Sequence, residues 1–291
     1  MDKETKQNIY KKIDNIVKNV AFPAWMMSDT DLEKYYEALS VKIVQENNFM
    51  TNVISLNEFL AKQQIDLFFN RPNRHQFGGS PIAANAWYSS QYNSLTIPMA
   101  LMNPGLFAIN FPMATNYGAL GSIIGHELVH AFDGKGIQFY YNGSLHRWMS
   151  DYSLRGFNNV RSCLIEQYDE FCYFPSDVCV NGTRTVNENI ADIGGLQAAY
   201  YAYQHYVKVH GEESRIAGLE QYSMEQIFFL SFAHNWCEYQ TKEELRRNLK
   251  DVHSPPDARV IIPLRDFEPF GRAFNCRIGD RMRPKVHCNA Y

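Results

Sequence analysis

The stretch GSIIGHELVHAFDGKG, residues 121–136, places two histidines and a glutamate in an otherwise apolar helical pattern. His126 and His130 are four residues apart, so on a helix they lie one turn apart on the same face. Glu127 directly follows the first histidine. In this spacing two imidazoles can bind Zn²⁺ while the carboxylate polarises the attacking water. The stretch therefore predicts a helix that carries part of a zinc site.

The composition is that of a globular protein. The chain has 291 residues, of which 45% are hydrophobic, a formal net charge of −3 and an isoelectric point near 6.3. This charge offers no basic footprint for nucleic acid or an anionic membrane. Apolar runs such as 227–233 are too short to cross a bilayer, and the N-terminus MDKETKQNIYKK lacks the apolar core of a secretion signal. We expect no nucleic-acid partner and no membrane span, with any signal or anchor outside this chain.

Six cysteines and two sequons favour an oxidising compartment, as in a secreted protein or a cell-surface ectodomain. Cys172 and Cys179 flank a short loop that a local disulfide could close, although the spacing alone does not choose among the possible pairings. No Cys-x-x-Cys pair supports the competing interpretation, a zinc–cysteine site. Asn142 and Asn181 begin Asn-Gly-Ser and Asn-Gly-Thr triplets and are glycosylation candidates.

The hydrophobic pattern predicts a mainly α fold with a small β component. Residues 92–98 are the best strand candidate, and Pro98 indicates an edge position for that strand. Ser55 is expected to cap one helix, and residues 70–82 should form a loop. Helices are expected over 4–20, 30–48, 55–69, 115–133, 151–170, 186–209 and 223–239, with short helices in irregular structure after them. The apolar face of the first would comprise Ile9, Ile13, Ile16, Val17 and Val20.

A catalytic zinc site needs a third protein ligand besides the two histidines. The segment TVNENIADIGGLQAAY, residues 185–200, puts Glu188 and Asp192 four residues apart on one helix face. Acids in a first turn can instead complement the helix dipole. Asp192, however, lies between Ile190 and Ile193, where a carboxylate without a partner would be costly. We therefore predict Glu188 as the third ligand and Asp192 as an acceptor that orients a ligand histidine.

The segments HELVHAFD and ENIADIGGLQAAY together resemble the neprilysin and endothelin-converting-enzyme family of zinc endopeptidases. The long gap between them also fits that family, and it exceeds the gap in the thermolysin and aminopeptidase families. The resemblance runs from residue 75 to the C-terminus. It implies a gluzincin, thermolysin-like zincin fold, and we expect one catalytic domain over 1–291 in which 1–74 form an N-terminal helical segment. Three further segments match in family order: NAWYSSQYNSLTIP at 85–98, FFLSFAHNWC at 228–237 and DVHSPPDARV at 251–260.

The resemblance implies a role for each matching position around the metal. One zinc ion per chain would be bound by His126, His130 and Glu188, with Glu127 as the general base. Asp192 and Asp133 would orient the ligand histidines. His253, steadied by Asp251, would donate a hydrogen bond to the developing oxyanion.

The resemblance also implies how a peptide substrate binds. Arg259 would hold a substrate carbonyl, and Asn85 with the Ala86 backbone would bind the peptide main chain. Trp236, Ile123 and Leu106 would line the pocket beyond the scissile bond. On pattern alone each has an ordinary explanation, since arginine is normally exposed, asparagine is a common turn residue and tryptophan is most often a core residue.

The chain departs from the family in length and in its cysteines. The family has a much longer ectodomain whose N-terminal portion forms a helical lid, so we expect a C-terminal fragment or a shortened member. Cys163 and Cys288 resemble a family pair that joins the end of the chain to the catalytic domain. Cys237 and Cys276 resemble residues whose partners lie in the absent portion. These two would pair with each other, pair with a separate chain or stay free.

Two functions follow from these features. The first is a zinc endopeptidase that cuts small peptides on the amino side of hydrophobic residues. The second is a truncated, weakly active or inactive relative that binds peptides or a partner chain. Glu127 favours the first, because a binding protein has no physical need for a general base, whereas the missing lid and the cysteines favour the second. A zinc aminopeptidase is a weaker option, because no acidic motif is present to capture a free α-amine.

Overall fold

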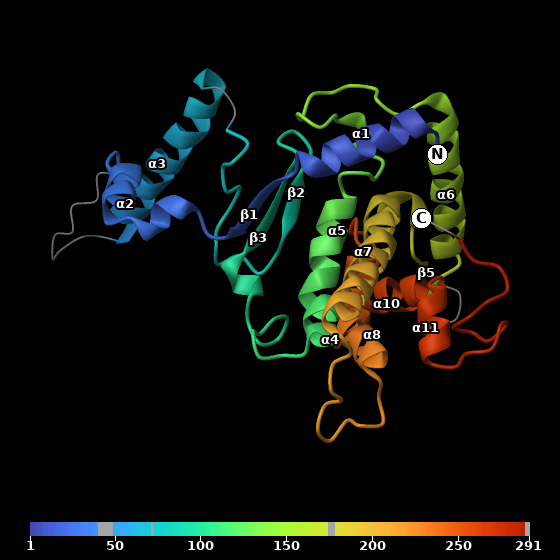
Figure 1. The fold of residues 1–291 in the computed structure, drawn as a ribbon. Helices are drawn as coiled ribbons and strands as arrows, with labels where there is room; N and C mark the ends of the chain where they lie inside the picture. Colours follow the sequence, from blue (N-terminus) through green and yellow to red (C-terminus); the bar gives the residue numbers. More distant parts are fainter. Residues whose placement is uncertain (40–48, 71–72, 174–177, 289–291) are drawn as a thin grey trace.

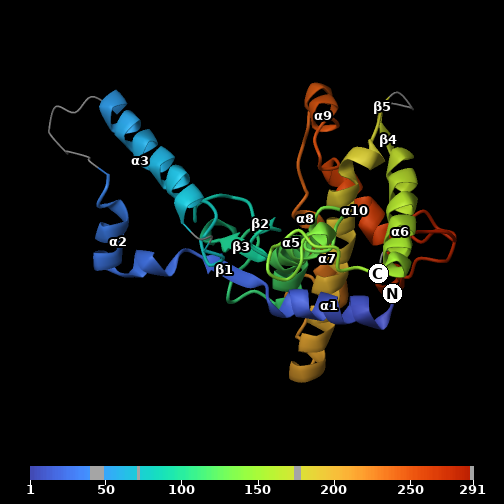
Figure 2. The same cartoon turned by 90° about the horizontal axis from the view of Figure 1, so that it is seen from above.

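Helices α5 and α7 cross near the centre of the fold, and most other elements pack around this pair (Figures 1 and 2). The computed structural model describes residues 1–39, 49–70, 73–173 and 178–288. The helices before the crossing are α1 (Lys3–Asp14), α2 (Asp29–Tyr36), α3 (Phe49–Phe69) and α4 (Met113–Asn116), with 3₁₀ turns η1 (Ala24–Met27) and η2 (Met99–Leu101).

The crossing pair and the helices that pack on it come after α4 in the chain. A π-helical turn, η3 (Tyr117–Gly121), leads directly into α5 (Ser122–Val129), and a 3₁₀ turn, η4 (Gly136–Gln138), follows. The later helices are α6 (Asp151–Asp169), α7 (Gly182–His210), α8 (Met224–His234), α9 (Lys242–Asn248), α10 (Pro256–Arg265) and α11 (Glu268–Ala273). The strands are β1 (Val17–Ala21), β2 (Trp87–Ser89), β3 (Ser94–Pro98), β4 (Cys172–Tyr173) and β5 (Val178–Cys179).

The prediction of a mainly α fold with a small β component is confirmed, although several boundaries differ. The helices predicted over 151–170 and 186–209 agree closely with α6 and α7. Helix α3 begins at Phe49, so Ser55 lies inside it and does not cap it. Residues 40–48, the end of the predicted second helix, lie outside the described residues. The predicted loop over 70–82 contains no helix or strand in its described part.

The first predicted helix is wrong beyond Asp14, because residues Val17–Ala21 form strand β1. The helical period therefore does not continue to Val20, which is exposed, and Ile13 is exposed as well, whereas Ile16 is buried. Strand β1 pairs in parallel with β3, which is antiparallel to β2 on its other side. The edge position predicted for β3 is also wrong. Pro98 is tolerated because it is the last residue of the strand. At the end of a strand, the missing backbone N–H group costs the sheet least stability.

Two glycines let α5 and α7 approach each other closely. A Cβ atom on Gly125 would lie 2.4 Å from the Gly195 carbonyl oxygen, and one on Gly195 would lie 2.4 Å from the His126 nitrogen. No larger residue fits at either position without moving one helix. The contact brings His126 on α5 directly against the first half of α7.

Three apolar clusters surround this crossing. The first packs the second half of α7 against α8 and α11 through Leu196, Phe228 and Phe267. The second packs the first half of α7 between α6 and α10, and the third lies between the sheet and α5. Each cluster buries one side of the crossing pair, so the position of α5 and α7 is set by burial on several sides.

Helix α1 is attached to the loop after α5 by a lysine. Lys12 is fully buried, and its Nζ donates to the carbonyl oxygens of Ala131, Gly136 and Phe139, each at 2.7 Å. These carbonyls flank Asp133, so the ammonium group holds the loop that carries this aspartate. The burial of Lys12 leaves no signal in the sequence, since the helical period predicts an apolar face for α1.

The disulfide candidates are confirmed. Cys163 on α6 is bonded to Cys288, and Cys172 on β4 is bonded to Cys179 on β5. Cys237 is exposed and free, and Cys276 is partly buried and free, so these two do not pair with each other.

The sequon residues Asn142 and Asn181 are exposed, and the Asn181 side chain accepts a hydrogen bond from the Arg184 amide at the start of α7. No helix in the described ranges is long and apolar enough to cross a membrane.

Helices α2 and α3 extend away from the crossing pair in both views (Figures 1 and 2). Trp25 stacks on Tyr35, and Phe59 contacts the same aromatic cluster, which joins the two helices. Much of the apolar surface of α3 remains exposed. Its exposed residues include Phe49, Ile54, Ile65, Phe68 and Phe69.

A buried polar group lies between α6 and α10. The Asp266 side chain accepts a hydrogen bond from the Gln167 amide at 2.8 Å, while its other carboxylate oxygen is buried without a partner. Burial raises the pKa of Asp266 to about 6, and the Gln167 hydrogen bond and Arg265 only partly oppose this. Folding therefore shifts the Asp266 equilibrium toward the neutral carboxyl group, which predominates only below about pH 6.

Replacing Lys12 with methionine is expected to lower the free energy of unfolding by about 2–4 kcal/mol. The buried Ala131 carbonyl loses its donor, and the carbonyls of Gly136 and Phe139 each lose one of two donors. The measurement is urea denaturation followed by circular dichroism. Lys3→Met, an exposed change on the same helix, serves as the control and should have little effect. Equal stabilities of the Lys12 and Lys3 variants would contradict the structural role of Lys12.

Asp266→Asn is expected to change how stability depends on pH. Below about pH 4 the Asp266 carboxyl group is protonated in both states; between about pH 4 and pH 6 it ionises first in the unfolded chain. The unfolding free energy of the parent should therefore fall by about 3 kcal/mol relative to the variant as pH rises through this window. Urea denaturation of both chains at a series of pH values measures the difference. Asp66→Asn, on the exposed part of α3, should show no such divergence.

Candidate functional site

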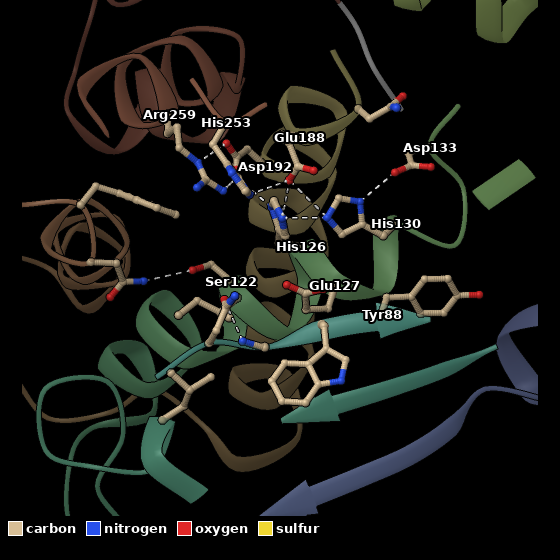
Figure 3. Close-up of a pocket in the computed structure, with 18 of the residues that line it drawn as sticks. Tyr88, Ser122, His126, Glu127, His130, Asp133, Glu188, Asp192, His253 and Arg259 are labelled. Atoms are coloured by element: carbon tan, nitrogen blue, oxygen red, sulfur yellow. Dashed lines mark hydrogen bonds and ion pairs between the residues drawn. The ribbon is translucent and has the colours of Figure 1, made fainter. Parts of the chain in front are cut away.

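A cavity of about 580 Å³ lies where α5, α7 and strand β2 meet (Figure 3). The polar residues at its centre come from α5, α7, α10 and the segment before α10. Nearly all the site residues expected from the sequence line it, the exception being Asp251, which contacts one of the lining residues. Those that line the cavity are Asn85, Ala86, Leu106, Ile123, His126, Glu127, His130, Asp133, Glu188, Asp192, Trp236, His253 and Arg259.

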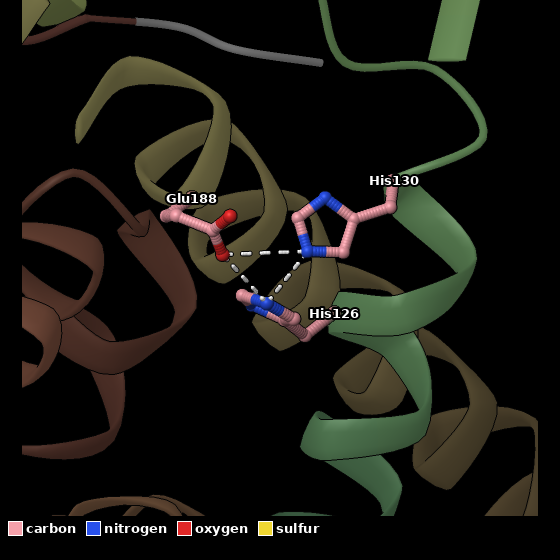
Figure 4. Close-up of side chains that lie close together, drawn as sticks. All are labelled: His126, His130 and Glu188. Carbon is pink, nitrogen blue, oxygen red and sulfur yellow. Dashed lines mark hydrogen bonds and ion pairs between the residues drawn. The ribbon is translucent and has the colours of Figure 1, made fainter. Parts of the chain in front are cut away.

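His126, His130 and Glu188 converge on one point (Figure 4). The two Nε2 atoms are 3.0 Å apart, and the Glu188 Oε2 atom lies 3.3 Å from that of His126 and 3.4 Å from that of His130. Helical spacing places the histidines one turn apart on α5, and the crossing helix α7 supplies the glutamate. The two imidazoles and the carboxylate thus form one cluster from two helices.

Each histidine is oriented by a carboxylate behind it. His126 Nδ1 donates to Asp192 Oδ1 and His130 Nδ1 donates to Asp133 Oδ2, both at 2.8 Å. Asp133 is itself held by the backbone amides of Lys135 and Gly136, which donate to its Oδ1 atom. In the neutral tautomers selected by these bonds, each Nε2 atom carries a lone pair directed into the cavity.

The cluster fits a metal cation. Glu188 Oε2 is buried without a hydrogen-bond partner, and it faces the two Nε2 lone pairs. Three electron-rich atoms this close repel one another unless a cation or protons lie between them. Burial alone would raise the pKa of Glu188, yet the contacts with His126, His130 and His253 hold it well below its usual value. Two imidazole nitrogens and one carboxylate oxygen are a donor set typical of catalytic zinc.

Glu127 lies beside this cluster on α5 and does not belong to it. Its side chain is buried, and burial raises its pKa, while the nearby histidines partly oppose the rise. The backbone amide of Tyr88 on strand β2 donates a hydrogen bond to it. Tyr88 could not be predicted from the sequence, since a backbone donor leaves no signal in residue identity.

His253 lies at the mouth of the cavity on the segment before α10. Its Nδ1 atom donates to Asp251 at 2.8 Å, as the resemblance implied, and its Nε2 atom is 3.2 Å from Glu188 Oε2. The side chain is 47% exposed, so a substrate can reach it. The contact with Glu188 raises the pKa of His253 despite partial burial. A protonated imidazole in this position donates from both nitrogens.

Arg259 connects the cluster of His126, His130 and Glu188 to the cavity wall. It is 8% exposed, and its Nε and Nη2 atoms donate to Asp192 at 2.8 and 2.7 Å. Its guanidinium group also lies over the Trp236 ring, 3.8 Å from the centroid. The ordinary explanation of an exposed surface arginine is therefore wrong. One carboxylate, Asp192, positions both a histidine of the cluster and an arginine that lines the cavity.

Strand β2 forms the edge of the sheet that borders the cavity. Asn85 and Ala86 immediately precede it, and the Asn85 side chain accepts a hydrogen bond from the Ala86 amide at 3.0 Å. In the part of the chain that the structure describes, the sheet order β1-β3-β2 leaves one side of β2 unpaired. Backbone groups at this border are thus placed where an extended chain could lie alongside them.

Apolar and polar side chains share the wall around the start of α5. Leu106, Ile123 and Trp236 line the cavity there, as the resemblance implied. Two polar residues that were not predicted, Ser122 and Asn235, line it with them. Both donate to the Ala119 carbonyl of η3, at 2.8 and 3.1 Å. They therefore satisfy an acceptor in the π-helical turn, a feature that hydrophobic periodicity does not reveal.

Comparisons with known proteins agree with this geometry. Residues 85–290 match peptidase family M13. An endothelin-converting enzyme homolog from Locusta migratoria is 35% identical over 292 residues, which cover 100% of this chain and 39% of that protein. Neprilysin-11 from Caenorhabditis elegans is 36% identical over 289 residues, or 99% of this chain and 34% of its own length. The chain thus spans well under half the length of these relatives.

Solved structures show the same arrangement of helices. The Haemonchus galactose-containing glycoprotein complex matches with a TM-score of 0.88 and 33% identity over 99% of this chain and 47% of that chain. The Mycobacterium tuberculosis zinc metalloprotease ZMP1 in complex with an inhibitor matches with a TM-score of 0.85 and 27% identity over 99% of this chain and 43% of that chain. These matches confirm the zincin fold. The chain belongs to peptidase family M13, and its relatives include neprilysins and an endothelin-converting enzyme homolog.

Proposed function

We propose that this chain carries the catalytic site of a zinc-dependent endopeptidase that cuts small peptides on the amino side of hydrophobic residues. The observation that carries the proposal is the convergence of His126, His130 and Glu188 with Glu127 next to them. Membership in a peptidase family supports the reaction class, and the M. tuberculosis zinc metalloprotease among the structural matches supports zinc as the metal.

In this proposal His126, His130 and Glu188 hold one zinc ion. When bound, zinc would supply Lewis acidity toward the scissile carbonyl and a water molecule. Asp192 and Asp133 keep the two imidazoles in the tautomers that direct Nε2 at the ion. The negative charge of these acids also offsets the cation, which lowers the cost of its burial.

Glu127 is the general base of the proposed reaction. Its carboxylate takes a proton from the attacking water and passes it to the leaving amine. Burial favours its uptake of that proton, because the pKa of Glu127 is raised. The hydrogen bond from the Tyr88 amide restrains the carboxylate beside strand β2.

His253 and Arg259 are placed to stabilise charge and orient the peptide. A protonated His253, steadied by Asp251, donates from Nε2 toward the oxygen on which negative charge develops. Arg259 is fixed by Asp192 and Trp236, and its remaining N–H groups can hold a substrate carbonyl.

The proposed peptide lies along the free edge of β2. Asn85 and the Ala86 backbone would pair with its main chain, and Leu106, Ile123 and Trp236 would accept the hydrophobic residue after the scissile bond. The bordering groups Ser122 and Asn235 add polar atoms to this wall. An extracellular location and glycosylation at Asn142 and Asn181 also belong to the proposal, and the two disulfides support an oxidising compartment.

A binding role without efficient turnover is the alternative. It is favoured by the apolar surface that α3 exposes and by the exposed free thiol of Cys237. Both features suit contact with a further portion of a longer protein or with a partner chain. The two roles differ in whether Glu127 is needed for peptide cleavage.

Asp133→Asn is expected to weaken zinc binding by about 10–100-fold. An amide NH₂ facing His130 Nδ1 would favour the tautomer with its proton on Nε2, which cannot ligate a metal. Competition titration with a chromophoric chelator measures the affinity. Asp14→Asn, an exposed change on α1, is the control. An unchanged affinity in Asp133→Asn would contradict the role of Asp133 in orienting His130.

Glu127→Gln is expected to reduce peptide hydrolysis by at least about 100-fold while zinc stays bound, because only the proton acceptor is lost. The assay uses a quenched fluorescent peptide with a hydrophobic residue after the scissile bond, together with metal analysis. Glu166→Gln, an exposed change on α6, should retain the parental rate. Bound zinc without Glu127-dependent cleavage would leave the binding role as the better explanation.

A further inference from the structure

A second cavity, of about 290 Å³, adjoins the catalytic one. Lys135 and Asn187 line both cavities, so the second extends the first beyond the end of α5. Its walls come from the loop after α5, from α6 and from the start of α7. The lining residues are Gly134, Lys135, Ile137, Gln138, Phe157, Asn158, Arg161 and Asn187. We call this extension the basic groove.

The charge of the basic groove is one-sided. Arg161 and Lys135 line it, and among the described residues no aspartate or glutamate does. Within the described ranges neither cation forms an ion pair, although Arg161 is half-buried. A half-buried guanidinium group without a carboxylate partner is an unfilled recognition site for one, since its planar N–H groups match a carboxylate.

The amide side chains of the groove are already partly used by the protein. Gln138 Nε2 donates to the Gly134 carbonyl at 2.9 Å, and Asn187 Oδ1 accepts from the Gly134 amide at 3.2 Å. These two bonds fix the loop that carries Lys135. The groups left to bind a ligand are the two cationic ones, together with the side-chain amides of Asn158 and Asn187.

The groove lies at one end of α5, and the apolar wall formed by Leu106, Ile123 and Trp236 lies at the other. Ile123 is near the start of the helix, His126 and His130 follow, and the loop at 134–138 comes after its end. A peptide that crosses the two histidines can thus place residues at both ends of α5. If the residue after the scissile bond occupies the apolar wall, the residues on the amino side of that bond extend toward Lys135 and Arg161.

We propose that the basic groove binds an acidic side chain of the substrate on the amino side of the scissile bond. This inference takes its direction from the proposed function and concerns peptide recognition, which does not require turnover. A carboxylate in the groove gains charge-assisted hydrogen bonds from Arg161 and attraction from Lys135. The predicted preference is for peptides that combine an acid on one side of the cut with a hydrophobic residue on the other.

The test compares peptides that differ in one side chain. Each peptide is acetylated and amidated, so that no terminal carboxylate competes, and carries either Glu or Gln at the second, third or fourth position before the scissile bond. Affinity is measured by fluorescence anisotropy on the zinc-supplemented full chain carrying Glu127→Gln, so that the peptides stay intact. We expect about tenfold tighter binding of the Glu peptide at one of these positions at low salt, falling several-fold at high salt.

Two substitutions test whether the preference for the Glu peptide comes from the basic groove. Arg161→Gln should reduce the Glu preference to less than about twofold and leave the Gln peptide unaffected, and Lys135→Gln should reduce it in part. Arg155→Gln is the matched control, because Arg155 is an exposed arginine on the same helix that does not line the groove. It should keep the full preference.

The outcomes separate this inference from the proposed function. Equal affinity for Glu and Gln peptides at all three positions, or a preference that survives Arg161→Gln, would overturn the basic groove whether or not the parent chain cleaves peptides. A preference that is lost in Arg161→Gln supports the groove even if the parent chain shows no hydrolysis, a result that would count only against the endopeptidase.

Discussion

The contact between α5 and α7 at Gly125 and Gly195 is the constraint on which the site depends. A side chain at either glycine would collide with the backbone of the other helix. Without this close approach, Glu188 would not lie within 3.4 Å of the Nε2 atoms of both histidines. The surrounding apolar clusters press the two helices together, and the glycines determine how close they come.

Charge organises the site around that contact. Asp192 accepts hydrogen bonds from both His126 and Arg259, and the Arg259 guanidinium group lies over the Trp236 ring. The ligand histidines and the cavity wall therefore depend on the same carboxylate. On the other side Lys12 holds the loop of Asp133, which orients His130. Buried groups of this kind are costly individually and become favourable only as a connected set. The geometry of the proposed chemistry is therefore maintained by residues well outside the cluster itself.

Much of this could be predicted from local sequence. Helical spacing places His126 and His130 on one face, and the apolar surroundings of Asp192 indicate a charged partner, which proves to be both His126 and Arg259. The secondary-structure predictions are wrong where contacts between distant segments override a local pattern. Residues 17–20 continue a helical period but form β1, since β3 offers them a parallel partner. That residues 1–291 form one domain stays a prediction, as do the roles assigned to the site residues.

The types and spacings of the chemical groups can be read along the chain: two imidazoles one turn apart, a carboxylate beside them, and a second helix with an acid pair. Which other groups meet them depends on the packing of distant segments. That packing brought Tyr88, Lys12 and Asn235 to the site or its supports, and it opened the basic groove beside the cleft. Spacing along one helix follows from its fixed geometry, whereas contacts between distant segments follow from packing of the whole chain.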